Sequence, residues 1–333
     1  MKKTNSMRNG EINSIEIDKN KVLEEISKSG QFQNDNIYIK QLEGEDSPEK
    51  YLSQMTLNNS KYIGPLNDSF QREGYGINIS ENGDKYFGCF ENDKRTKTGV
   101  YFFAPEEKDN VTYTECYQGE WNDNIKEKSG IYIWLEQTNE NETVKVDFDS
   151  FVGEIENDIY KRGTFLSKIG SDYYVYHGDF DREGKKNCED AFFYSSKSDN
   201  LLHGKVSNDI FLSGYISFFD SNTNSIKDLV YATFDKEGKI INVVNKEDLE
   251  NDEIEKEEKL MSLFRTTVFE VNYFGNIFTN YQNIKYYVDE YVSSFPIFEQ
   301  KEELQKIIDY LDGYKSINIY NVIEEKIYNK SLD

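Results

Sequence analysis

The chain has 333 residues, which is enough for one large domain or two ordinary ones. It contains 39 Lys and Arg residues against 62 Asp and Glu residues, so its net charge is −23. A field of this sign repels phosphate backbones and anionic membrane surfaces, which argues against nucleic acid and acidic lipid as partners. The three cysteines lie far apart and form no CxxC pair, so the sequence suggests neither a disulfide framework nor a zinc ribbon.

Residues 1–60 are predicted to be an N-terminal extension that is partly disordered. The start of the chain has no apolar run of signal-peptide length, and no later stretch approaches 18 consecutive apolar residues. The stretch DKNKVLEEISKSG predicts one short helix, because Asp18 is a suitable N-cap and Gly30 a suitable end. We therefore expect a cytoplasmic protein.

A short motif, aromatic-x-Gly-x-apolar, recurs along the middle of the chain. Its copies are YIGPL at 62, YFGCF at 86, YQGEW at 117, FVGEI at 151 and YHGDF at 176, with a weaker copy, LHGKV, at 202. A polar turn and a second apolar stretch usually follow: GYGINI at 74, GVYFF at 99, GIYIW at 130, GTFL at 163 and GYISF at 214. A degenerate seventh copy from residue 230 has Ala232 in place of the glycine. Each copy indicates a β-hairpin, and the recurrence indicates a repeat architecture.

Side chains alternate between the two faces of a strand, which predicts how each motif is oriented. Tyr86, Gly88 and Phe90 should share one face, with Phe87 and Cys89 on the other. A glycine between two aromatic residues leaves a hollow that a neighbouring ring can fill. We therefore predict a mainly β fold over residues 61–245, in which an elongated antiparallel sheet of stacked hairpins aligns its motif aromatics on one face.

These units resemble the MORN repeat (membrane occupation and recognition nexus), whose sequence runs close to YxGxWxxGxxxGxG. The resemblance covers about residues 62–218 and implies six or seven stacked hairpins. The residues that match motif positions, and that we expect to build the sheet, are Tyr62, Gly64, Tyr86, Gly88, Phe90, Gly99, Tyr117, Gly119, Trp121, Gly130, Phe151, Gly153, Gly163, Tyr176, Gly178, Phe180, Gly204 and Gly214. The usual GxG survives only as Gly74 and Gly76, and APEEKDNVTYTE is inserted after Phe103.

From residue 246 to residue 333 the apolar spacing changes from period 2 to period 3.6, which is typical of helices. The stretch KEDLENDEIEKEEK at 246–259 indicates an acidic linker or a solvated helix face. A helical stripe, which we interpret as a packing or partner face, consists of Ile284, Tyr287, Val288, Tyr291, Val292 and Phe295. Two further helices are predicted from Leu304, Ile307, Ile308 and Leu311, and from Tyr320, Ile323 and Ile327. The helices either cap the open end of the sheet or form a separate module for a partner. Because the stripe at 284–295 is wide enough to pack on the sheet, we predict that they cap or cross it.

The sequence contains no recognisable catalytic site, and we expect no enzyme activity, cofactor or metal. His177 and His203 precede motif glycines, so they occupy equivalent positions in successive units. Two strands per unit place equivalent positions roughly 10 Å apart, whereas the ligands of one ion lie about 2 Å from it. We expect both histidines to face solvent. No GxSxG motif is present, and GYGINISENG has no GK[ST].

The MORN resemblance implies a non-enzymatic scaffold or adaptor in a cytoskeletal or ciliary assembly, such as an axoneme. The negative charge favours other proteins with basic or helical segments as partners. The resemblance also implies two alternatives: a membrane-associated, phospholipid-binding protein, and a regulatory subunit of an enzyme complex. Against the first, residues 62–218 contain 29 acidic and 17 basic residues, whereas anionic lipid usually requires basic clusters.

Overall fold

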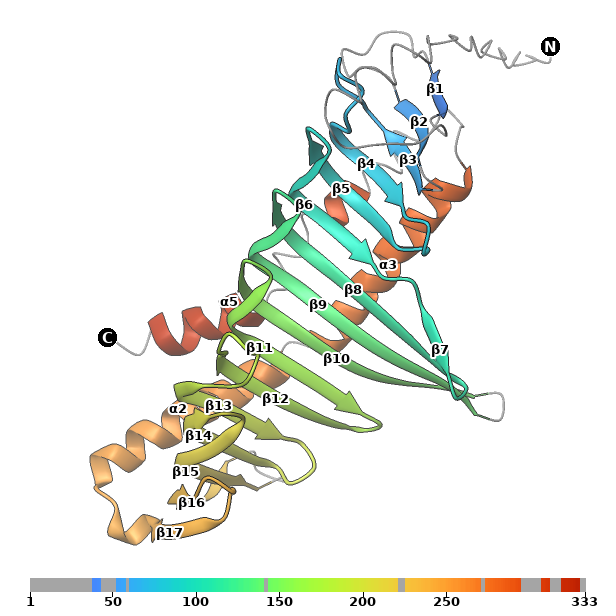
Figure 1. Cartoon of the computed structure of the whole chain (residues 1–333). Helices are drawn as coiled ribbons and strands as arrows, with labels where there is room; N and C mark the ends of the chain where they lie inside the picture. Colours follow the sequence, from blue (N-terminus) through green and yellow to red (C-terminus); the bar gives the residue numbers. More distant parts are fainter. Residues whose placement is uncertain are drawn as a thin grey trace, which may run out of the picture.

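The computed structural model describes residues 38–42, 52–57, 60–140, 143–220, 225–270, 273–294, 307–311 and 319–329. In these ranges the chain forms a long twisted sheet of 17 strands with helices on one of its faces (Figure 1). The expected fold class, an elongated antiparallel sheet followed by a helical region, is confirmed. The helix predicted from Asp18 lies outside the described residues.

Except for β6 and β7, strands that are consecutive in the sequence are neighbours in the sheet, and all pairings are antiparallel. The strands are β1 (Tyr38–Leu42), β2 (Leu52–Leu57), β3 (Ser60–Gly64), β4 (Gly74–Ile79), β5 (Lys85–Glu91), β6 (Lys94–Phe102), β7 (Glu106–Lys108), β8 (Val111–Asn122), β9 (Ile125–Glu140), β10 (Thr143–Glu156), β11 (Ile159–Ile169), β12 (Asp172–Asp179), β13 (Cys188–Ser195), β14 (Asn200–Ser207), β15 (Ile210–Phe219), β16 (Ile226–Phe234) and β17 (Ile240–Asn245). The insertion after Phe103 provides β7, which pairs with the start of β8, while β6 pairs with the rest of β8. The sheet begins at β1, earlier than the first motif copy.

The motif glycines lie opposite one another in register, so that they form one row across the sheet. This glycine row runs through the paired positions Gly76, Gly88, Gly99, Gly119, Gly130, Gly153, Gly163 and Gly178. It continues through Ala191, Gly204, Gly214 and Ala232. The degenerate copies therefore keep the register and place the smallest available side chain in the row.

Tight turns close the hairpins at one edge of the sheet. Their two central residues are Asn or Asp with positive φ, as at Asn92 (49°) and Asp93 (68°) between β5 and β6. Two-residue hairpin loops need this left-handed conformation, because its twist matches that of the strands, and Asn and Asp adopt it at least cost. Equivalent pairs are 123–124, 157–158 and 208–209.

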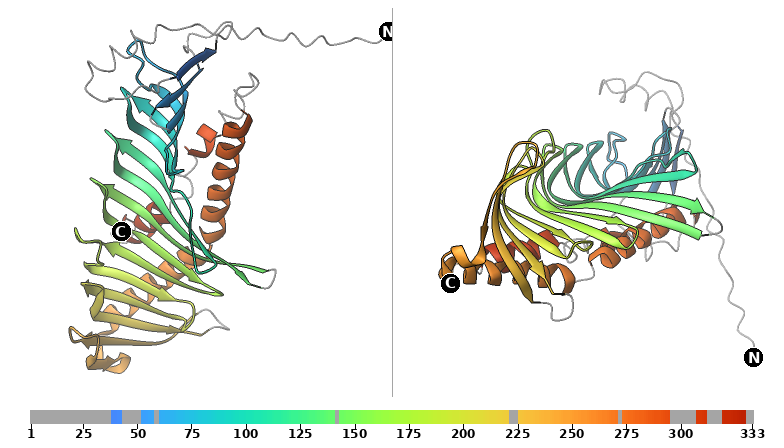
Figure 2. Two further views of the ribbon diagram at one scale, coloured as in Figure 1. Left: turned by 45° about the vertical axis from the view of Figure 1, so that its right-hand side comes forward. Right: turned by 90° about the horizontal axis from the view of Figure 1, so that it is seen from below.

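The C-terminal helices lie along one face of the sheet (Figure 2). They are α2 (Asn251–Glu270), α3 (Tyr273–Ser294), a helical turn at 307–311, α5 (Ile319–Ile323) and the π-helical η3 (Glu324–Asn329), while the 3-10 turn η1 (Lys246–Asp248) precedes them. Their apolar side chains share one buried core with the sheet residues of that face. The helices therefore cross the sheet, rather than capping its end or standing apart as a separate module.

Candidate interaction face

On the face opposite the helices, each repeated tyrosine lies over the glycine row. A Cβ atom added at Gly99 would lie 2.3 Å from the hydroxyl oxygen of Tyr86 and 2.6 Å from its ring carbons. The Tyr86 hydroxyl donates to the carbonyl of Cys89 at 3.2 Å. The hydroxyls of Tyr62, Tyr117 and Tyr176 make the same bond to the carbonyls three residues further on. In each Tyr-x-Gly motif the tyrosine ring therefore packs against glycine, because glycine has no side chain that would collide with the ring.

A second aromatic side chain fills the space between successive tyrosines, edge to face. Phe90 lies 5.4 Å from Tyr62 and 5.1 Å from Tyr86 between ring centroids, and Trp121 lies 5.4 Å from Tyr86 and 5.2 Å from Tyr117. This aromatic ladder consists of Tyr62, Tyr86, Phe90, Tyr117, Trp121, Phe151, Tyr176 and Phe180, with Ile155 in the place of the second aromatic residue of its copy. All of its members are buried except Phe180, which is half-buried. The motif aromatics are therefore core residues rather than a surface for a partner.

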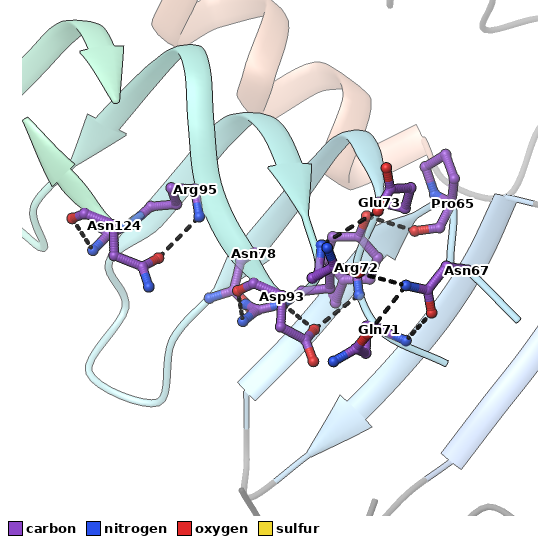
Figure 3. A network of polar contacts seen from close by, with 11 residues as sticks. Pro65, Asn67, Gln71, Arg72, Glu73, Asn78, Asp93, Arg95 and Asn124 are labelled. Atoms are coloured by element: carbon purple, nitrogen blue, oxygen red, sulfur yellow. Dashed lines mark hydrogen bonds and ion pairs between the residues drawn. The ribbon is translucent and has the colours of Figure 1, made fainter. Parts of the chain in front are cut away.

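A repeated polar contact joins each hairpin turn to the preceding unit (Figure 3). Asp93 accepts hydrogen bonds from the backbone and side chain of Arg72 at 2.8 and 3.0 Å, and its N–H donates to the Arg72 carbonyl. The Arg95 backbone N–H donates to Asn124 Oδ1, and the Asn124 N–H donates to the Arg95 carbonyl. We call these contacts turn clasps, and two more of them join Lys126 to Asp158 and Lys186 to Asp209.

The basic side chains of the turn clasps also lie over the aromatic ladder. The Arg95 guanidinium is 4.4 Å from the Trp121 ring centroid, and the Arg72 guanidinium is 4.9 Å from that of Phe90. Lys126 and Lys186 lie over Tyr117 and Tyr176 at 5.5 Å. Cation–π contact and ion pairing engage these cations within the fold, so they are poorly placed to attract an anionic ligand.

Beside the buried ladder lies an outer aromatic row of half-buried rings: Phe103, Trp134, Phe165 and Phe193. Trp134 stacks on Tyr132 at 4.5 Å and lies 6.3 Å from Phe165 between ring centroids. The sequence analysis missed this row because it followed only the motif positions. The signal was the period-2 continuation after the second glycine of each hairpin, as in GIYIW and GVYFF.

Carboxylates surround Trp134 on the same face. The register places Trp134 opposite Glu115 of β8 on one side and Asp149 of β10 on the other. In the next row, Glu136 lies opposite Tyr113 and Asp147. Directly opposed residues of antiparallel strands share a face and lie close together. We name Phe103, Glu115, Trp134, Glu136, Asp149 and Phe165 the acidic–aromatic patch.

The charges of this patch are only partly engaged by the fold. Glu115 accepts a hydrogen bond from the Tyr132 hydroxyl. Within the part of the chain that the structure describes, neither Glu136 nor Asp149 has an ion-pair partner. A half-buried ring with such carboxylates beside it can bind a Lys or Arg side chain, because the ring face and the carboxylates attract the same cation.

The expectation that the two histidines face solvent is wrong. His177 is fully buried, and its ring nitrogens lie 2.9 Å from Thr164 Oγ1 and 2.9 Å from Glu324 Oε1. His203 is 7% exposed and lies 2.5 Å from Asp190 and 2.7 Å from Glu257. Both point to the face that the helices cover, which the repeat alone could not reveal. They form the polar part of the joint between sheet and helices.

The two buried histidines differ in charge. Burial lowers the pKa of His177, and this outweighs its hydrogen bond to Glu324. Burial also opposes the charged form of His203, but hydrogen bonds to Asp190 and Glu257 raise its pKa to about 9. His203 is therefore a cation at neutral pH, held between carboxylates from the sheet and from α2.

The predicted stripe of α3 is directed at the sheet where its side chains are described. Ile284 and Val288 are fully buried, and Tyr287 and Val292 are half-buried. The side chain of Tyr291 and the whole of Phe295 lie outside the described parts of the chain. In the last three helical segments Ile307, Leu311, Tyr320, Ile323 and Ile327 are also buried, whereas Leu304 falls outside the described ranges.

Comparison with known proteins identifies no family for this chain. No family model matches it, and no curated protein is significantly similar. No helix of the described residues is both long and apolar enough to cross a membrane. Among the same residues, no group of three or more His, Cys, Asp or Glu side chains is arranged to hold a metal ion.

Proposed function

We propose that this chain is a non-enzymatic scaffold of the MORN type, which binds a Lys- and Arg-containing segment of another protein at the acidic–aromatic patch. The observation that carries the proposal is Trp134, a half-buried ring between Glu115 and Asp149 on the face that the helices leave uncovered. Rings supply anchoring area, and carboxylates supply steering and specificity.

The structure also bears on the choice between a protein and an anionic lipid. The four basic side chains nearest the aromatic ladder are each engaged by a turn clasp, and three of them pair with an aspartate. The carboxylates of the patch would repel anionic headgroups. We therefore propose a protein partner. The proposal that the larger assembly is cytoskeletal or ciliary rests on the MORN resemblance alone.

Fluorescence titration tests the proposal, because the chain has only two tryptophans and Trp121 is buried. In a Trp121→Phe protein, Trp134 reports on the patch alone. We expect a short Arg- and Lys-rich peptide to shift or quench its emission saturably, and a Glu-rich peptide of equal length to leave it unchanged. An identical response to both peptides, or none to either, would contradict the proposal.

A further inference from the structure

The last strand, β17, leaves one edge of the sheet open. It pairs with β16 along one side, from Phe234↔Ile240 to Val230↔Asn245. Within the described residues no register pairs its other side with a strand, since β2 is paired with β1 and β3, and β17 lies at the end of the sheet (Figure 1). In an antiparallel edge strand every second residue directs its N–H and C=O away from the neighbouring strand. This edge is therefore a template on which another strand can add.

Three apolar side chains of β17 are exposed. Ile240 is 63% exposed, Ile241 68% and Val243 44%. Since successive residues point to opposite faces, neither face of the strand is covered, whereas Leu229 and Ala232 of β16 are fully buried. Exposed apolar edge strands of this kind are usually protected, because they invite pairing.

Few of the usual protective features are present in β17. The strand IINVVN contains no charged residue and no proline. A register shift between Thr233 and Phe234 leaves Ile241 unpaired at one end, which restricts the regular ladder to Asn242–Asn245. A short but regular stretch remains open, long enough for a few backbone hydrogen bonds.

The charge around this edge indicates what would bind there. The strand itself is neutral, but residues 246–259, which follow it directly, hold eight acidic residues against three lysines. Lys246 is ion-paired with Glu258, and Lys239 is ion-paired with Glu237 at 2.9 Å. A second copy of this chain would bring the same negative charge to the contact, which disfavours self-pairing.

We propose that β17 binds an extended segment of another protein as an added strand, and that this segment has β-branched residues flanked by Lys or Arg. Backbone hydrogen bonds would supply affinity, β-branched side chains would cover the exposed isoleucines and valine, and the flanking cations would face the acidic start of α2. The surface is distinct from the acidic–aromatic patch, so either site can exist without the other.

The test uses the full chain and three fluorescent peptides with the same Thr-Val-Thr-Val core. The first has flanking lysines, the second has flanking glutamates, and the third has lysines with one core residue replaced by proline. We expect anisotropy to show saturable binding of the first peptide, and at least tenfold weaker binding of the other two. Ile241→Lys should weaken binding of the first peptide at least tenfold. The new lysine repels the flanking lysines of the peptide, and its bulky charged side chain obstructs the edge.

Tyr286→Lys is the matched control, because Tyr286 is 60% exposed on α3 and lies away from this edge. It should bind the first peptide as the wild-type chain does, and so should Trp134→Ala, which alters only the acidic–aromatic patch. Equal effects of Ile241→Lys and Tyr286→Lys, loss of binding in Trp134→Ala, or equal binding of all three peptides would overturn the proposal. A wild-type dimer that Ile241→Lys converts to a monomer would also overturn it, because the occupant would then be a second copy.

Discussion

His177 of β12 and Glu324 of η3 lie 2.9 Å apart, and this contact joins the repeat sheet to the last helical segment of the chain. Arg162 approaches the same carboxylate at 2.7 Å, so Glu324 links two strands at once. The helical region is therefore fastened to the sheet by buried polar groups as well as by apolar packing.

Replacing His177 should destabilise the protein. His177→Ala leaves a cavity and removes a partner of Thr164 and of Glu324, so we expect a loss of about 2–4 kcal/mol. Tyr286→Ala, at an exposed position, should cost under about 0.5 kcal/mol. Urea denaturation followed by circular dichroism measures both. Equal denaturation midpoints for the two variants would show that the buried contact of His177 adds nothing to stability.

The charge of His203 predicts a pH-dependent stability. Its pKa in the folded state is about 9, above the value of about 6.5 in an unfolded chain. The resulting stabilisation is fully present below about pH 6.5 and is lost as the pH rises through 9. The free energy of unfolding should therefore fall by about 1–3 kcal/mol over this window.

His203→Gln is the control, because it cannot titrate. The difference in unfolding free energy between wild type and His203→Gln should shrink steadily from pH 6.5 to 9.5. A difference that stays constant with pH would mean that Asp190 and Glu257 do not hold His203 in its charged form.

A double-mutant cycle tests the coupling of ring and glycine. Gly99→Ala places a Cβ against the buried ring of Tyr86, and we expect it to cost about 2–3 kcal/mol through overpacking. In a Tyr86→Ala background the same change meets no ring, so most of that cost should disappear. Additive effects in thermal unfolding would be inconsistent with the contact.

The two tryptophans should behave in opposite ways. Trp121 is 5% exposed and its indole N–H donates to the Gly99 carbonyl at 3.3 Å, so Trp121→Ala should destabilise by about 3–5 kcal/mol. Trp134 is half-buried, so Trp134→Ala should destabilise less while abolishing binding of a basic peptide. Calorimetric unfolding and peptide titration of both variants decide this, and a larger stability loss for Trp134→Ala would reverse our assignment of the two residues.

The sheet could be predicted from sequence because its signals are local. Tyr86, Gly88 and Gly99 belong to one hairpin, and the same spacing in each copy predicts the same register. The joint between sheet and helices could not be predicted in this way. His177 and Glu324 are 147 residues apart, and nothing in the repeat distinguishes the face that the helices cover.

The candidate interaction face illustrates the same limit. The motif includes Tyr117 and Trp121, which the fold buries. It does not include Trp134, which the fold leaves half-buried. The carboxylates beside Trp134 come from two neighbouring strands, so their convergence depends on the register of three strands.

The most direct test of the proposed function compares two variants with the same change in charge. One replaces the patch carboxylates (Glu115→Gln, Glu136→Gln and Asp149→Asn), and the other replaces three exposed carboxylates away from both proposed sites (Glu91→Gln, Glu183→Gln and Glu189→Gln). Isothermal titration with one Arg- and Lys-rich peptide at fixed salt gives both affinities. We predict that the patch variant binds at least tenfold more weakly than wild type and that the other variant stays within about twofold, since surface charges away from a contact act mainly through screened long-range attraction. Equal weakening in both variants would contradict the account, because the peptide would then respond to net charge rather than to this patch.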